Sequence, residues 1–86
     1  MQLPAPSPSR ISPGTKFRHY KGGLYAVLGT CLIEATLTSG VLYKPLQGDM
    51  QDVIWMRPMA DFLDTVSTIS GPVPRFALVE NPQLSA

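Results

Sequence analysis

Short runs rich in β-branched and aromatic residues alternate along the chain with small groups of glycine and polar residues. Such runs are typical of β-strands, and the glycine-containing groups between them indicate tight turns. The predicted turns are Gly22-Gly23, Ser39-Gly40, Gln47-Gly48-Asp49 and Ser70-Gly71-Pro72. The predicted strands are Thr15–Tyr20, Leu24–Glu34, Val41–Leu46, Asp52–Arg57 and Arg75–Val79.

One segment, residues 58–63, departs from the strand pattern. Pro58 suits the first turn of a helix, and Met59, Phe62 and Leu63 follow at helical spacing, so a short α- or 3₁₀-helix is expected there. A flat sheet of five short strands would leave its edges exposed. The pattern therefore predicts a mainly β fold, either a small five-stranded SH3-like barrel or a strongly bent antiparallel sheet, with this helix as a plug.

The Gly22-Gly23 pair predicts a two-residue hairpin, because a type I′ turn needs positive φ at both central positions. Counting outward from this turn places Tyr20 opposite Tyr25 and Phe17 opposite Leu28. Strand alternation then gives two faces. The expected core face carries Phe17, His19, Ala26 and Leu28, and the other face carries Arg18, Tyr20, Tyr25 and Val27.

Composition and length describe one small folded domain. The chain has 86 residues, 44% of them hydrophobic and 15% charged, with a formal net charge of +1. We expect a disordered Pro/Ser-rich tail over residues 1–13, a single β domain over 14–79 and a frayed tail over 80–86. Cys31 is the sole cysteine, which excludes an internal disulfide. Without a signal peptide pattern or a membrane-length apolar run, the expected location is cytoplasmic.

The face with Arg18, Tyr20 and Tyr25 places a cation beside two tyrosines, as in surfaces on which nucleic-acid bases stack. Tyr43, Trp55 and Arg57 would extend it into one aromatic and cationic groove. The alternative is that the tyrosines and Trp55 fill the core and that Arg57 pairs with Asp61 or Asp64.

Two further residues also allow more than one interpretation. Arg75 is either a ligand contact near the barrel mouth or a surface cation beside core Phe76. His19 is the sole histidine, and no carboxylate or nucleophile lies at a local spacing that would activate it. We therefore expect His19 to be a hydrogen-bonded structural residue.

The ordered motifs FRHYKGGLYAVLG (17–29), LYKPLQG (42–48), IWMRPMADFL (54–63) and PRF (74–76) resemble a bacterial family catalogued as domain of unknown function 1653. The most specific elements are RHYKG at 18–22 and WMRP at 55–58, and the resemblance covers nearly all of 14–79. It implies a shared all-β fold and a shared surface, but no reaction. The segment EATLTSG (34–40) departs from the resemblance because it is less acidic than expected.

The sequence contains no glycine-rich phosphate loop and no metal-ligand spacing, so neither a cofactor nor a metal is expected. Three functions remain. The preferred one is a non-catalytic module that binds a planar or anionic ligand, such as a nucleotide or single-stranded nucleic acid. The second is a protein-interaction or homo-oligomeric module. The third is a small enzyme or enzyme accessory domain with His19 and Arg75 in its pocket. No membrane partner is expected.

Overall fold

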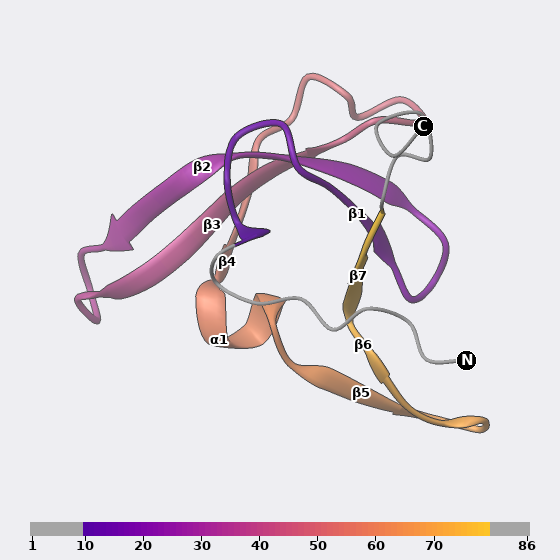
Figure 1. Cartoon of the computed structure of the whole chain (residues 1–86). Coiled ribbons are helices and arrows are strands. Elements are labelled where there is room, and N and C mark those ends of the chain that lie inside the picture. Colours follow the sequence, from indigo (N-terminus) through magenta and orange to yellow (C-terminus); the bar gives the residue numbers. More distant parts are fainter. Residues whose placement is uncertain (1–9, 80–86) are drawn as a thin grey trace.

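Seven strands and one short helix make up residues 10–79, the part of the chain that the computed structural model describes (Figure 1). Their bounds are β1 (Lys16–His19), β2 (Leu24–Ile33), β3 (Thr38–Pro45), β4 (Trp55–Pro58), α1 (Met59–Phe62), β5 (Thr65–Thr68), β6 (Gly71–Pro74) and β7 (Phe76–Leu78). Five strands form an antiparallel sheet in the order β4-β3-β2-β1-β7, and β5 and β6 form a separate hairpin.

The predicted mainly β class and the short helix are confirmed, and the fold takes the bent-sheet form of the prediction. Within residues 10–79 the sheet does not close into a barrel, because β4 and β7 are its two edges and do not pair with each other. The β5–β6 hairpin was not predicted as strands. Thr65, Val66 and Thr68 carry a β-branched signal, but Pro72 and Pro74 on the opposite strand obscure it.

The β1–β2 hairpin has a different register from the predicted one. Phe17 lies opposite Tyr25, and the backbone N–H of His19 donates to the carbonyl of Gly23 over 2.7 Å. The loop therefore contains Tyr20, Lys21 and Gly22, and of the two glycines only Gly22 has positive φ. Relative to the prediction the pairing shifts by an odd number of residues, which exchanges the two faces of β2.

As a result, Tyr25 and Val27 join Phe17 and His19 on the face that carries the core, whereas Ala26 lies on the opposite face with Arg18. Leu28 also does not lie in the core. It falls at a β-bulge between Val27 and Gly29, where the pairing with β3 shifts, and it is exposed. We call the face with Phe17 and Val27 the core face and the opposite one the outer face.

The predicted turn at Ser39-Gly40 is wrong. The chain reverses over residues 34–37, where Leu37 has a positive φ of 55° and its N–H donates to the carbonyl of Ile33 over 2.7 Å. Gly40 instead lies inside β3, opposite Cys31. A Cβ at Gly40 would lie 2.9 Å from the Cys31 Sγ and 2.9 Å from the Met56 Sδ, so the glycine allows close side-chain packing.

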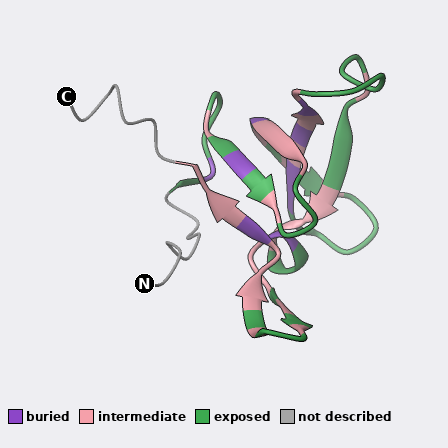
Figure 2. Ribbon diagram, turned by 90° about the vertical axis from the view of Figure 1, so that its right-hand side faces the viewer, coloured by how far each residue is buried: buried purple, intermediate pink, exposed green. Residues whose placement is uncertain are grey.

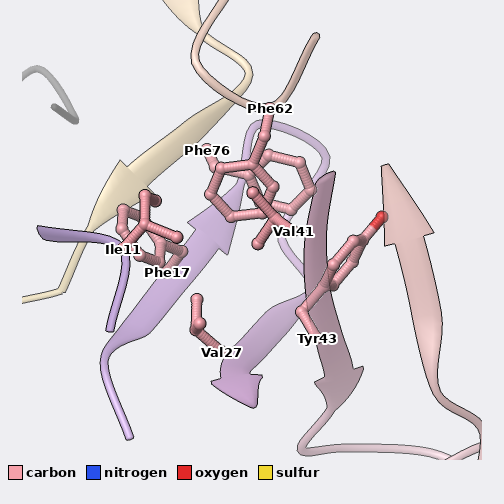
Figure 3. Close-up of a cluster of buried hydrophobic side chains, with 7 residues drawn as sticks. All are labelled: Ile11, Phe17, Val27, Val41, Tyr43, Phe62 and Phe76. Atoms are coloured by element: carbon pink, nitrogen blue, oxygen red, sulfur yellow. The ribbon is translucent and has the colours of Figure 1, made fainter. Parts of the chain in front are cut away.

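The core lies between the core face of the sheet, α1 and the segment that precedes β1 (Figures 2 and 3). Its buried side chains are Ile11, Phe17, Val27, Val41, Tyr43, Phe62 and Phe76. Phe62 is the buried residue of α1, in agreement with the predicted plug. Ile11 precedes the predicted domain boundary at residue 14, yet it packs in this core.

Residues 1–9 and 80–86 lie outside the described part of the chain, so the prediction of terminal tails there stays a prediction. Within residues 10–79, α1 is the only helix, and it is far too short to cross a membrane.

Candidate aromatic and cationic site

The core face continues past the packed core into a group of aromatic and cationic side chains. Strand pairing places Trp55 opposite Tyr43 and Arg57 opposite Val41, so both β4 residues lie on the core face. We call the group formed by His19, Tyr25, Tyr43, Arg57 and Phe76 the Arg57 cluster. Its residues come from β1 to β4 and β7 of the five-stranded sheet, and Phe62 of α1 packs against its Tyr43 and Phe76 rings.

Edge-to-face ring contacts hold the cluster together. The Tyr43 ring lies 5.5 Å from the rings of both Tyr25 and Phe76, and the His19 ring lies 5.0 Å from Phe76, all with steep interplanar angles. Such arrangements add stabilisation beyond simple burial because the positive ring edge meets the negative ring face. These side chains are therefore held in fixed positions before any ligand arrives.

Arg57 lies across this aromatic group. Its Cζ is 5.9 Å from the centroid of the Phe76 ring, and its Nε donates to the Tyr43 hydroxyl over 3.4 Å. In Figure 3 that hydroxyl points away from the other core side chains, toward β4. Within residues 10–79 no carboxylate forms a salt bridge with Arg57. The predicted pairing of Arg57 with Asp61 or Asp64 is therefore wrong.

The other N–H groups of Arg57 have no hydrogen-bond partner within residues 10–79, and none of their nitrogens is completely buried. The side chain is half-buried, but within residues 10–79 no buried side-chain nitrogen or oxygen lacks a hydrogen-bond partner. A guanidinium carries five donors and suits planar, two-point recognition of an anion. Arg57 thus presents unused donors from a fixed position next to aromatic rings.

Arg75 has a different role from Arg57. Its Nε and Nη2 donate to the two carboxylate oxygens of Asp64 over 2.7 and 3.2 Å, and its backbone N–H donates to the Asp64 carbonyl. These bonds tie the bend between β6 and β7 to the residue that precedes β5. The hydrogen bond from Arg75 holds the pKa of Asp64 below its usual range. Arg75 adds positive charge near the cluster, but its Nε and Nη2 donors already bind Asp64.

His19, a member of the Arg57 cluster, has three cationic side chains near it. Partial burial lowers its pKa, and Arg57, Arg75 and Lys21 lower it further. The ring is therefore neutral at pH 7. Its Nδ1 accepts the backbone N–H of Lys21 over 3.1 Å, so in the neutral ring Nε2 carries the proton. A neutral His19 can still donate from Nε2 to an acceptor.

The seven predicted ligand-binding residues do not form one surface. Tyr25, Tyr43 and Arg57 come together, Trp55 flanks them with its side chain partly exposed, and Arg75 lies nearby. Arg18 lies on the outer face, where its Nη1 donates to the Gly22 carbonyl over 2.8 Å. Tyr20 follows β1 and pairs through its N–H with the Arg75 carbonyl.

Two residues of the cluster were not predicted as ligand contacts. His19 was expected to be structural, and Phe76 was expected in the core, where the structure indeed buries it. The alternation of β1 already puts His19 on the core face. The incorrect register put Tyr25 on the opposite face, so the sequence did not show that His19 and Tyr25 lie together. Within residues 10–79 no group of three His, Cys, Asp or Glu side chains could hold a metal ion.

Comparison with known proteins shows the family to which the chain belongs. The family model described as protein of unknown function (DUF1653) matches residues 15–78, which is most of the chain. The chain belongs to the DUF1653 family. This confirms the resemblance drawn from the RHYKG, WMRP and PRF motifs.

A solved relative supports the same assignment. The crystal structure of a DUF1653 protein from Bordetella bronchiseptica matches with a TM-score of 0.72 and 33% sequence identity, over 87% of this chain and 95% of that one. No curated protein matches the chain. The DUF1653 membership therefore establishes the domain type and supplies no reaction or ligand.

Proposed function

We propose that this DUF1653 domain is a non-catalytic binding module whose Arg57 cluster takes a ligand that combines a planar ring with an anionic group, such as a nucleotide or a short single-stranded nucleic acid. The supporting observation is the half-buried guanidinium of Arg57, which has aromatic neighbours, open N–H donors and no carboxylate partner within residues 10–79.

The chemistry around Arg57 favours an anion with a flat group attached. Lys21, Arg57 and Arg75 all lower the pKa of His19, so cations gather here although Asp64 pairs with Arg75 and the chain carries a net charge of only +1. Trp55, opposite Tyr43, offers an exposed ring for stacking. Base stacking on such rings tolerates different sequences, and phosphate contacts supply much of the affinity.

Trp55 supplies the experiment, because it is the sole tryptophan and lies beside the cluster. Titration of the full chain with mononucleotides and short single-stranded oligonucleotides should change its fluorescence. NMR amide shifts should concentrate on Tyr43, Trp55 and Arg57. Affinity should fall as salt rises from about 50 to 200 mM, because the release of counterions that favours phosphate binding contributes less at higher salt.

Matched variants locate the site. Arg57→Gln should weaken binding about tenfold or more, the effect of losing a charge-assisted contact to an anion. Arg18→Gln removes the same charge from the outer face and should leave affinity nearly unchanged. Equal losses in the two variants would show only a general charge effect. No saturable change at millimolar ligand would refute the proposal.

A second function, homo-oligomerisation, is favoured by one specific observation. Ile54, Trp55 and Met56 are consecutive, lie at the start of the edge strand β4, and are 64, 40 and 46% exposed. Clusters of exposed apolar side chains often mark interaction surfaces. Light scattering over a range of protein concentrations tests this, and a constant monomer mass that is unchanged by Ile54→Ser would exclude it.

A further inference from the structure

A cavity of about 320 Å³ lies beside β1 and β7. Its walls combine segments that are distant in sequence, namely the end of β1, the β1–β2 loop, the end of β6 and β7. Arg18 and Ala77 face each other across β1 and β7 and both line it. His19 is the one member of the Arg57 cluster that lines it, whereas Arg57 and the neighbouring Trp55 do not.

The lining is mainly apolar, with three polar side chains, those of Arg18, His19 and Tyr20. Its apolar wall comes from Val73, Pro74, Ala77 and Val79. Water forms few hydrogen bonds with an apolar wall, so an apolar group of suitable size can displace that water. The volume is at the lower end of the range for small-molecule sites, which suits one ring or one branched chain.

Arg18 gives the cavity its charge. The side chain is exposed, and its Nη1 donates to the Gly22 carbonyl over 2.8 Å, which positions the guanidinium over the loop. No salt bridge engages Arg18 within residues 10–79. Its other N–H groups are open to a ligand, and a guanidinium matches the two oxygens of a carboxylate.

Tyr20 is another polar residue of the lining. Its backbone N–H donates to the Arg75 carbonyl over 2.9 Å, and the residue remains 37% exposed. The Lys21 Nζ lies 5.8 Å from the centre of the Tyr20 ring, which adds positive charge at the same rim. The cavity therefore has an apolar floor and a cationic rim.

We propose that this cavity binds a small amphipathic carboxylate, with its ring or branched chain against Val73, Pro74 and Ala77 and its carboxylate on Arg18. The few polar groups on the walls cannot satisfy the many hydroxyls and phosphates of a nucleotide. A single anionic group at the rim and an apolar body in the cavity match the lining. The proposal does not depend on the function of the Arg57 cluster.

Phenylacetate is a suitable probe, with phenylacetamide as its neutral control of the same shape. On the ¹⁵N-labelled full chain, phenylacetate should produce saturable amide shifts at Arg18, Val73 and Ala77. Phenylacetamide should bind about tenfold more weakly, because it lacks the charge that the guanidinium recognises. Arg18→Gln should reduce phenylacetate affinity to a similar extent and leave phenylacetamide affinity unchanged.

Two further variants separate this site from the Arg57 cluster. Ala77→Leu places bulk in the cavity and should abolish the shifts of both probes, with folding checked by the spectrum of the variant itself. Arg57→Gln should leave the phenylacetate-induced shifts at Arg18, Val73 and Ala77 unchanged. No saturable shifts at these residues up to about 10 mM, equal affinity for acid and amide, or loss of these shifts in Arg57→Gln would each overturn the proposal.

Discussion

The rings of Phe62 and Phe76 stack nearly parallel, with centroids 4.1 Å apart and an interplanar angle of 6°. Phe62 belongs to α1 and Phe76 to β7, so this contact fixes the helix against the end strand of the sheet. The Arg57 guanidinium lies over the same Phe76 ring. The position of the helix and the position of the candidate ligand contact therefore depend on one aromatic side chain.

Phe62→Ala should remove about 3–5 kcal/mol of unfolding free energy, because it leaves a cavity at a fully buried site. That is a large share of the stability expected for a domain of this size. Urea denaturation followed by circular dichroism measures the loss. Phe62→Leu keeps most of the volume and should cost clearly less. Equal losses in the two variants would contradict a packing origin.

Gly40→Ala should destabilise the sheet by about 1–3 kcal/mol, because the new methyl group would overlap the sulfur atoms of Cys31 and Met56. Met56→Ala removes one of the two sulfur atoms that the new methyl group would contact. In a double-mutant cycle, Gly40→Ala should therefore cost less in the Met56→Ala background than in the wild type. Purely additive losses would show that the methyl group does not meet Met56.

The contribution of His19 to the unfolding free energy should be constant well above about pH 6.5 and fall as the pH drops through and below that value. The pKa of His19 in the folded protein lies below its unfolded value, chiefly through partial burial. As pH falls below the unfolded pKa, the unfolded chain takes up a proton that the folded protein binds less readily. His19→Gln should remove most of this slope. A slope that persists in His19→Gln would assign it to other groups.

Arg57→Gln should raise the pKa of His19, because the guanidinium disfavours a positive charge on the imidazole ring. NMR titration of the imidazole signals measures this directly, since His19 is the sole histidine. Lys16→Gln removes a cation that does not contribute to the His19 shift and should leave the pKa unchanged. Equal shifts in both variants would indicate a general charge effect.

The fold class and most of the elements could be predicted because each depends on local sequence. β-branched and aromatic runs gave β1 to β4 and β7, and the Pro58 signal with apolar spacing gave α1. The strand pairing was harder to predict. The Gly22-Gly23 pair fits both a two-residue and a three-residue loop, and nothing local distinguishes them.

The candidate site could be predicted only in part for the same reason. Tyr25, Tyr43 and Arg57 were named, but the face of Tyr25 depends on the β1–β2 register, and the error placed Tyr25 on the same face as Arg18. Gly40 illustrates a second limit. A glycine beside a serine indicates a turn, whereas here the lack of a Cβ allows Cys31 and Met56 to approach across the sheet. Such a tertiary contact leaves no local signal.

Strand β4 limits how copies of this domain can aggregate. It is a free edge of only four residues, it ends at Pro58, which has no N–H, and the chain then enters α1. A strand from another molecule could form only a few backbone hydrogen bonds with β4. The exposed side chains of Ile54 and Met56 therefore favour a closed association through side-chain burial over open-ended, fibril-like growth of the sheet.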